Sequence, residues 1–247
     1  MTGKRYILIE LFLVIILSYL LINLFLTYNR EQTVSSNIVV EEKICYLTFD
    51  DGPSKNTEKI LDILAEYDAK ATFFLLGCEL SEEKRPVLER IIKEGHEVGL
   101  HSNIHKYDKL YADEETCLKD FDSEYQVLKE EYGVDTKLLR FPGGSTCVCL
   151  KGRRKSFINK MRENGFRCFD WHVSGEDSVG NPTVWSIQKN VFDWVFNYNY
   201  PIVLLHDSKI ADTTVEALPG ILEKVKEAGY SFETLEERDE YLFRLKK

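Results

Sequence analysis

Apolar and polar positions along the chain fall into two patterns, and the first is a long apolar stretch near its beginning. Residues 6–26 are apolar except for three polar side chains, and Lys4 and Arg5 come just before them. At about 1.5 Å per residue, a helix of this length can span a bilayer. The pattern predicts an N-terminal transmembrane anchor over residues 1–28, followed by a polar linker over residues 29–42.

The sequence after this stretch bears on whether the anchor stays attached. No small-x-small cleavage site follows, since residues 27–30 read Thr-Tyr-Asn-Arg. This favours an uncleaved anchor over a cleaved signal peptide. Lys4 and Arg5 favour a cytoplasmic N-terminus because positively charged residues stay on the inner side, although Arg30 weakens that bias. We therefore expect a single-pass protein of the cell membrane with residues 43–247 outside the cell.

The second pattern begins near residue 43, where short apolar runs alternate with segments of helical periodicity. The expected strands are residues 44–49, 71–76, 96–101, 137–141, 166–173, 202–206 and 230–235. The expected helices are residues 57–67, 82–94, 114–132, 157–164, 184–196 and 215–228. Alternation of this kind is typical of βαβ units and a parallel sheet.

Polar residues stand at the ends of several expected strands and indicate how the sheet is arranged. They are Asp50 and Asp51 after the first strand, His101 after the third, Arg140 after the fourth, Trp171 near the end of the fifth and His206 after the sixth. An open doubly wound sheet gathers its ligands at one switch point, whereas a barrel gathers them from the carboxyl ends of many strands. We therefore expect an α/β fold, an irregular (β/α)7 barrel with its active site at those ends.

Two pairs of residues among these could hold a metal ion. Asp50 and Asp51 are adjacent carboxylates before a Gly-Pro turn, and taken alone they fit a solvated acidic turn as well as a site. His101 and His105 lie four residues apart, a spacing that places both imidazoles on one face of a helical turn. With one carboxylate they make a His-His-Asp set that leaves a position open for water, as catalytic zinc sites do.

Arg140 and His206 lie in apolar surroundings. Arg140 stands in the stretch Leu-Arg-Phe-Pro-Gly-Gly of residues 139–144, where an arginine calls for a buried carboxylate partner. Gly143 and Gly144 come next, and they leave the backbone accessible, so a substrate can approach its N–H groups. His206 ends the apolar run of residues 202–206, where a structural core histidine is as common as a functional one.

Composition narrows the class of protein. The chain has 247 residues, 44% of them hydrophobic, which allows one sizeable α/β domain with a full core. Its net charge of -9 makes it a poor candidate for nucleic-acid binding, which needs basic patches. We therefore expect no nucleic-acid partner.

The six cysteines do not form a zinc ribbon, because none of them makes a CxxC pair. Cys147 and Cys149 are too close to bridge each other without strain. Buried free thiols are common in apolar runs such as those around Cys45, Cys78 and Cys168. We expect mostly free thiols, while an extracellular location leaves one or two disulfides open.

Taken together, these stretches resemble the polysaccharide deacetylase family (carbohydrate esterase family 4, with the nodulation-type deacetylase domain) over residues 43–236. Four family motifs appear in the family order, as Thr48-Phe49-Asp50-Asp51-Gly52, His101-Ser-Asn-Ile-His105, Arg140-Phe-Pro142-Gly143-Gly144 and Leu204-Leu205-His206. Residues 169–178 resemble the fourth of the family's five motifs in the form found in membrane-anchored bacterial members. Those members are taken to be peptidoglycan N-acetylglucosamine deacetylases.

The resemblance implies a role for each motif residue. Asp50 would be the general base and His206 the general acid, and Arg140 would hold Asp50. One divalent metal, Zn²⁺ with Co²⁺ or Mn²⁺ as alternatives, would be bound by Asp51, His101 and His105. The substrate would contact Pro142, Gly143, Trp171 and Leu204.

Two departures from the family pattern affect these roles. Gly143 stands where many members have an aromatic residue, so that wall of the site is missing here. The usual acid-x-x-acid-aromatic of the fourth motif reads Ser174-Gly-Glu-Asp177-Ser178. Either Asp177 or Asp170 could therefore support His206, and we favour Asp177.

The sequence predicts a membrane-anchored, metal-dependent N-deacetylase of cell-wall N-acetylglucosamine, with peptidoglycan as the preferred substrate and a monomeric chain. A chitooligosaccharide deacetylase or an acetyl esterase on the same scaffold is the alternative within the class. A catalytically silent wall-binding module is the alternative outside it, against which the intact set of base, ligands and acid argues. A phosphotransfer role for Asp50 and Asp51 is disfavoured, because no phosphate-cradling glycine loop or lysine accompanies them.

Overall fold

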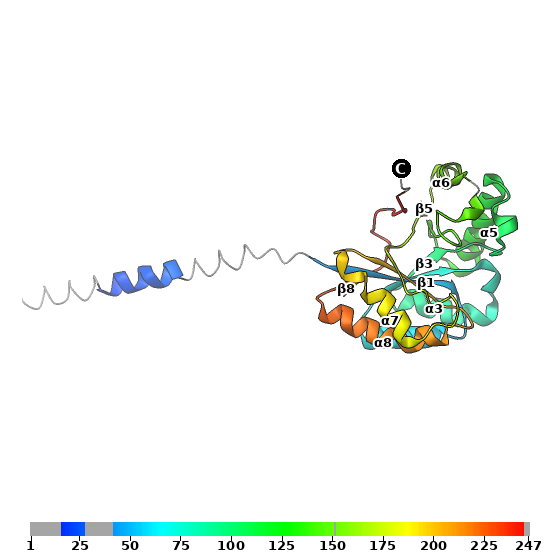
Figure 1. Cartoon of the computed structure of the whole chain (residues 1–247). Coiled ribbons are helices and arrows are strands. Elements are labelled where there is room, and N and C mark those ends of the chain that lie inside the picture. The colour runs from blue at the N-terminus through cyan, green and yellow to red at the C-terminus, as the bar shows by residue number, and fades with distance from the viewer. Residues whose placement is uncertain (1–15, 28–41, 151, 245–247) are drawn as a thin grey trace, which may run out of the picture. The chain divides into compact units, whose positions relative to one another are not determined.

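The computed structural model describes residues 16–27, 42–150 and 152–244 of the chain (Figure 1). The chain divides into two compact units, Met1–Glu41 and Glu42–Lys247, and each is described by itself.

In the first unit the described residues, 16–27, are helical. No helix among the described residues is both long enough and apolar enough to cross a membrane. Residues 1–15 and 28 of the predicted anchor and residues 29–41 of the predicted linker lie outside the described residues. The membrane anchor therefore stays a prediction.

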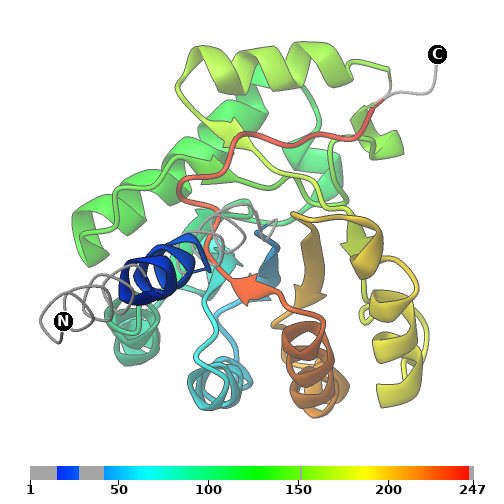
Figure 2. The same ribbon diagram turned by 90° about the vertical axis from the view of Figure 1, so that its left-hand side faces the viewer.

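The second unit is built on one parallel sheet whose described strands run in the order β5-β4-β3-β2-β1-β7-β6, with β8 paired to the start of β1. The strands are β1 (Ile44–Gly52), β2 (Ala71–Leu75), β3 (Glu97–Leu100), β4 (Leu138–Leu139), β5 (Arg167–Cys168), β6 (Val173–Ser174), β7 (Ile202–His206) and β8 (Ser231–Phe232). The sheet curls into a half-barrel (Figure 2). The predicted α/β fold with an irregular seven-stranded barrel is confirmed.

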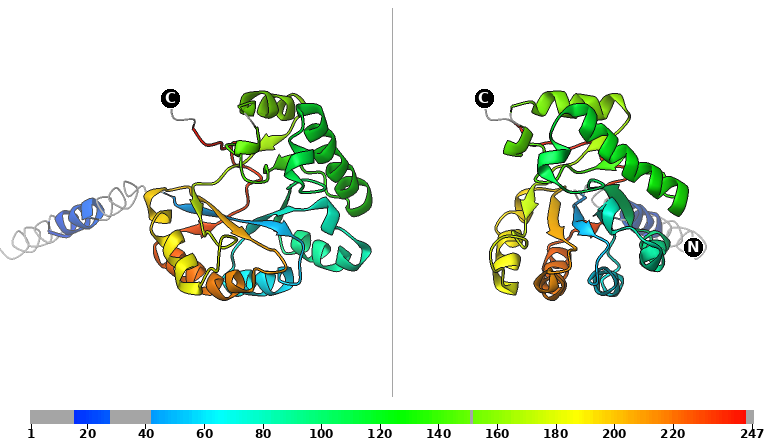
Figure 3. Two further views of the ribbon diagram at one scale, coloured as in Figure 1. Left: turned by 45° about the vertical axis from the view of Figure 1, so that its right-hand side comes forward. Right: turned by 90° about the vertical axis from the view of Figure 1, so that its right-hand side faces the viewer.

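Helices cover the outer face of this sheet (Figure 3). They are α2 (Thr57–Glu66), α3 (Arg85–Lys93), α4 (Tyr107–Leu110), α5 (Glu114–Tyr132), α6 (Arg154–Glu163), α7 (Val184–Phe192) and α8 (Asp212–Glu227), with short 3-10 turns at Gly77–Glu79, Glu82–Lys84, Val148–Leu150 and Val195–Asn197. Each long helix turns an apolar stripe inward, as α2 does with Ile60, Leu61 and Leu64. This burial is what holds the helices to the sheet.

The central strand β1 divides its side chains between two environments, because successive side chains of a strand point to opposite faces. Cys45, Leu47 and Phe49 are fully buried in the main core, with the helices. Tyr46 belongs instead to a small second cluster with residues such as Phe74. Tyr46, Thr48 and Asp50 alternate with the core residues and therefore lie on the opposite face of β1. Asp50 is the last of the three, so this face carries a carboxylate near the end of the strand.

The predicted strand over residues 166–173 is wrong as a single strand, because its partners change along its length. Phe169 N donates to Leu139 O in β4, whereas His172 N donates to Ile202 O in β7. Between them, Asp170 N donates to Tyr241 O near the end of the chain. The segment therefore crosses the open side of the half-barrel, and β5 and β6 lie at opposite ends of the strand order.

The structure joins Cys147 and Cys149 in a disulfide, although their separation of two residues argued against an unstrained bridge, and this is one of the disulfides that the sequence left open. The 3-10 turn at Val148–Leu150 brings their Cα atoms to 5.2 Å, within the range that a disulfide requires. The other cysteines, Cys45, Cys78, Cys117 and Cys168, are free, as expected.

Candidate active site

The end of β1 carries a bulge that places both paired carboxylates in one cavity. Asp50 pairs with Phe74 and Gly52 with Leu75, so Asp51 is an extra residue in the ladder. Its backbone is left-handed, with φ 73°. In a regular strand the two side chains would face opposite sides, whereas here both Asp50 and Asp51 line the same cavity.

This cavity, of about 330 Å³, lies at the C-terminal ends of the strands and collects residues from across the predicted motifs. The predicted residues that line it are Asp50, Asp51, His101, His105, Gly143, Trp171, Leu204 and His206. Pro142 is not among the lining residues; it is buried, and its carbonyl accepts a hydrogen bond from the Tyr111 hydroxyl at 2.7 Å. A larger, open depression of about 600 Å³ lies beside α6, but it contains none of these groups.

Asp51, His101 and His105 form the set of side chains that could hold a metal ion. Asp51 Oδ1 lies 3.6 Å from His101 Nε2 and 3.5 Å from His105 Nε2. The same Oδ1 atom is buried and has no hydrogen-bond partner among the described residues. A buried carboxylate oxygen left in this way is costly, and a cation between the three groups would satisfy it. The two-nitrogen, one-oxygen set fits a catalytic zinc site.

The hydrogen bonds of His101 direct its lone pair into this set. Its Nδ1 lies 2.9 Å from the backbone oxygen of Arg140, so Nδ1–H donates and Nε2 stays free to bind. Burial lowers the pKa of His101 to about 3, which outweighs the opposite effect of Asp51. The imidazole is therefore neutral, the form that metal coordination requires.

The loop from His101 to His105 is not the helical turn that the spacing suggested. Ser102 has φ 93° and His105 has φ 51°, so the two imidazoles converge through left-handed backbone. Helix α5 stabilises this loop, because Glu124 accepts from the backbone N–H of His101 at 3.3 Å and of Ser102 at 2.9 Å. Asp120, one turn earlier, accepts from the hydroxyl of Ser102 at 2.6 Å.

Asp50 is held as the resemblance implied, by a fully buried arginine. Arg140 Nη1 lies 2.8 Å from Asp50 Oδ1 and 2.7 Å from Thr48 Oγ1, and Arg140 Nε donates to Phe169 O at 3.1 Å. The second carboxylate oxygen of Asp50 faces His101 Nε2 at 3.6 Å. Burial raises the pKa of Asp50, and the charge of Arg140 opposes that rise.

His206 is paired with Asp177, which belongs to the stretch resembling the fourth motif. Asp177 Oδ1 lies 2.8 Å from His206 Nδ1, and its Oδ2 accepts from His206 N and from the Thr214 hydroxyl. Burial lowers the pKa of His206, but the hydrogen bond and charge of Asp177, aided by Asp50, outweigh it and raise the pKa to about 9. His206 is therefore protonated at neutral pH.

Asp170, the alternative partner, serves another purpose. Its carboxylate accepts from the backbone N–H groups of Ser145 and Phe243, both at 2.8 Å. It thus connects the loop after the third motif to the end of the chain, and it is Asp177 that contacts His206.

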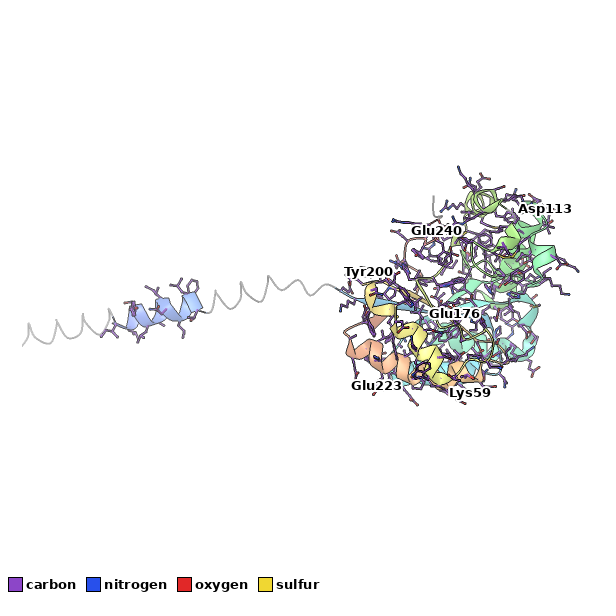
Figure 4. All side chains as sticks on the ribbon, viewed as in Figure 1. Lys59, Asp113, Glu176, Tyr200, Glu223 and Glu240 are labelled. Atoms are coloured by element: carbon purple, nitrogen blue, oxygen red, sulfur yellow. A yellow bond between two sulfur atoms is a disulfide. The ribbon has the colours of Figure 1, made fainter. Side chains whose placement is uncertain are left out.

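Several residues around the cavity were not predicted from the sequence. They are Tyr107, Ser174, Glu176, Ser178 and Val179 in the lining, and Glu124 behind it. Glu176, labelled in Figure 4, and its neighbours belong to the stretch resembling the fourth motif and could have been included. Glu124 could also have been noticed in the sequence, because it is an acidic residue on the same face of α5 as the buried Phe121 and Leu128.

The fold and the site together define an α/β-barrel hydrolase with a candidate metal centre. Residues 37–169 match the family model described as polysaccharide deacetylase. A peptidoglycan-N-acetylglucosamine deacetylase of Bacillus cereus is 36% identical over 208 residues, which cover 81% of this chain and 72% of that protein.

Solved structures agree with this match. The catalytic domain of a peptidoglycan N-acetylglucosamine deacetylase from Eubacterium rectale superposes with a TM-score of 0.76 at 33% identity, covering 83% of this chain and 94% of that one. A polysaccharide deacetylase from Bacillus cereus gives a TM-score of 0.72 at 34% identity, covering 83% and 97%. The chain belongs to the polysaccharide deacetylase family, whose members are hydrolases acting on N-acetyl groups.

Proposed function

We propose that the protein is a metal-dependent deacetylase that hydrolyses the N-acetyl group of N-acetylglucosamine residues in peptidoglycan and releases acetate. The observation that carries this proposal is the buried, unpartnered Oδ1 of Asp51 facing two imidazole nitrogens. Similarity to the Bacillus cereus and Eubacterium rectale peptidoglycan N-acetylglucosamine deacetylases supports the substrate.

Asp51, His101 and His105 would hold one divalent cation, Zn²⁺ by the nature of the donor set, with Co²⁺ or Mn²⁺ as alternatives. Such an ion, when bound, supplies a water of lowered pKa and polarises the acyl oxygen of the substrate.

Asp50 would act as the general base on the attacking water. Arg140 fixes one oxygen of its carboxylate at 2.8 Å and leaves the other facing the histidines. A base must be oriented and must be free to accept a proton, and this arrangement meets both conditions. Burial raises its pKa, so it takes up a proton more readily than an exposed aspartate.

His206 would give a proton to the leaving amine. Asp177 accepts the Nδ1–H, so the proton on Nε2 is the one to be transferred. The oxyanion needs a donor as well, and the exposed backbone N–H of Gly143 makes no hydrogen bond to another described residue. It is available to stabilise the developing negative charge.

For location, we propose that residues 6–26 anchor the chain in the cell membrane with residues 43–247 on the outside, where peptidoglycan lies. The support is the apolar pattern and the charges of Lys4 and Arg5. We also propose that the protein acts as a monomer.

The test is acetate release from peptidoglycan and from chitin oligomers side by side, with acetylated xylan as an ester substrate. We expect release from peptidoglycan that is abolished by a chelator and restored by Zn²⁺. The Asp50→Asn variant serves as the inactive control. Faster release from chitin oligomers or xylan would replace the proposed substrate, and no release from any of them would favour a wall-binding module.

A further inference from the structure

Two consecutive glycines next to the cavity each support an aromatic ring that comes from another part of the chain. A Cβ atom on Gly143 would lie 3.3 Å from the ring and hydroxyl of Tyr107. A Cβ atom on Gly144 would lie 2.9 Å from the ring of Trp171. Both glycines have φ 75°, which side chains rarely adopt, so the backbone favours glycine at both positions. A Cβ atom would in addition be too close to Trp171 at position 144 and tightly packed against Tyr107 at position 143.

The same two rings line the cavity that contains the paired carboxylates and the histidines. Tyr107 and Trp171 thus form an aromatic wall along the Gly143–Gly144 loop. Tyr107 occupies the volume that a side chain at position 143 would fill, so this wall is supplied by α4 rather than by the loop itself.

Tyr107 is held in place from behind while its outer side remains open. Its ring meets that of Tyr111 at 5.9 Å between centroids, and Tyr111 is 2% exposed with its hydroxyl bonded to Pro142 O. Tyr107 itself is 39% exposed, and its hydroxyl makes no hydrogen bond to another described residue. A rigid aromatic face with a free hydroxyl is a good surface for a ligand that is apolar on one face and rich in hydroxyl groups at its edge.

We propose that Tyr107 is a substrate-binding residue, which together with Trp171 packs against the sugar ring whose N-acetyl group is removed. The inference rests on the proposed function and adds to it the surface that recognises the sugar. The C–H face of a pyranose is apolar, and burying it against an aromatic ring releases water from both.

A purely structural role is the competing explanation, because the ring of Tyr107 also meets that of His105 at 5.5 Å, edge to face. If support of His105 were its purpose, loss of the ring would weaken metal binding. The two explanations therefore differ in what they predict for metal content and for sugar affinity.

The experiment compares Tyr107→Leu and Tyr107→Phe in the full-length, zinc-loaded protein. Leucine keeps apolar support for His105 but has no flat face, and phenylalanine keeps the face. Trp185→Leu is the control, since Trp185 is a 70% exposed aromatic residue of α7 outside the cavity lining. Calorimetry with the tetramer of N-acetylglucosamine gives Kd, acetate release gives KM and kcat, and elemental analysis gives zinc content.

We expect Tyr107→Leu to raise Kd and KM by roughly 10-fold, with zinc content unchanged. Tyr107→Phe and Trp185→Leu should stay within about 3-fold of the wild type, because the aromatic face is intact. Wild-type affinity in Tyr107→Leu, or loss of zinc in step with affinity, would overturn the inference. A wild-type protein that neither binds nor deacetylates any glycan would instead overturn the proposed function, and this inference with it.

Discussion

Asp50 and Asp51 are identical in chemistry and adjacent in sequence, yet their surroundings differ. Asp50 is 3% exposed and bonded to Arg140, whereas Asp51 has an oxygen with no described partner except the two imidazoles that face it. The bulge at the end of β1 produces this difference, because it turns two neighbouring side chains toward one cavity while leaving them different partners.

The two isosteric changes should therefore have different effects. Asp51→Asn should lower zinc affinity, with activity partly restored by excess metal, because it weakens a direct ligand. Asp50→Asn should retain zinc and lose turnover by on the order of 10² to 10⁴, the usual contribution of a general base. Metal analysis of both purified variants, with activity titrated against zinc, measures this.

Arg140→Lys is a useful companion variant, since it keeps the charge but not the several bonds of the guanidinium. It should retain zinc and resemble a mild form of Asp50→Asn. If Asp50→Asn loses the metal while Asp51→Asn keeps it, the two roles are reversed.

The pair of His206 and Asp177 leads to a prediction about pH. Since the pKa of His206 is raised to about 9, a proton donor at this position is present below that pH and is lost above it. The value of kcat/KM should therefore fall as the pH rises through about 9. In Asp177→Asn the charge is gone and burial remains to lower the pKa, so the fall should move by roughly two pH units to lower pH.

Asp170→Asn is the matched control, because Asp170 is equally buried but contacts Ser145 and Phe243 instead of His206. It should lower stability without moving the basic limb. A basic limb that is unchanged in Asp177→Asn would show that His206 is not the proton donor.

At the scale of elements, α5 supports the metal-binding loop although it contributes nothing to the cavity lining. Glu124 is fully buried, and burial raises its pKa well above the ordinary value. Its two oxygens accept from the backbone N–H groups of His101 and Ser102. The loop that carries both imidazoles is thus tied to a long, rigid helix, as precise positioning of ligands requires.

Glu124→Leu should weaken zinc binding by roughly 10-fold, the usual effect of removing support from a ligand. It leaves the buried N–H of Ser102 without an acceptor, whereas the N–H of His101 still donates to Leu75 O at 2.8 Å. The free energy of unfolding should therefore also fall, by about 1 to 3 kcal/mol. Glu124→Gln keeps one acceptor oxygen and should lie between Leu and the wild type. Zinc competition with a chelator and thermal unfolding give the two readouts.

Glu130→Gln, an exposed change on the same helix, should alter neither quantity. A Glu124→Leu protein that unfolds more easily but binds zinc as tightly as the wild type would restrict Glu124 to stability.

Elements with strong local signals could be predicted from the sequence. The helix α5 has the predicted bounds because Asp113, labelled in Figure 4, accepts from Thr116 N at its start, and Gly133 takes the left-handed conformation at its end. The strands β2 and β7 are buried along their whole apolar runs, and β1 is buried from Cys45 to Phe49. In contrast, residues 166–173 are broken into two strands by hydrogen bonds to partners far away in sequence, which no local pattern contains.

The same distinction applies to the site. His101, His105 and His206 could be predicted because they stand at or just after the ends of strands, where a barrel gathers its ligands. Tyr107 could not, because its helix has four residues and its importance depends on contact with Gly143, which only the folded chain brings near.

At the scale of the whole catalytic unit, the end of the chain covers the open side of the half-barrel. The ring of Tyr241 stacks on that of His172 at 3.8 Å between centroids, and Phe243 meets Trp171 at 5.1 Å. Glu240, labelled in Figure 4, accepts from the backbone of Cys168 in β5. Trp171, which lines the cavity, is therefore supported by Phe243, a residue near the end of the chain. The family match covers residues 37–169 and does not include this terminal segment.

The location of this unit can be tested with a thiol that the fold exposes. Cys78 is exposed, whereas Cys45, Cys117 and Cys168 are buried and Cys147 and Cys149 are paired. If residues 43–247 lie outside the cell, a membrane-impermeant maleimide added to intact cells should label the protein, and Cys78→Ser should abolish the label.

Protease added to the same cells should degrade the unit from about residue 43 onward, while a cytoplasmic marker protein stays intact. The two probes are independent, because one reports a single side chain and the other the backbone of exposed loops. Labelling and proteolysis that appear only after lysis would place the unit inside the cell. The orientation inferred from Lys4 and Arg5 would then be wrong, and peptidoglycan outside the membrane would be out of reach of the site, whatever its chemistry.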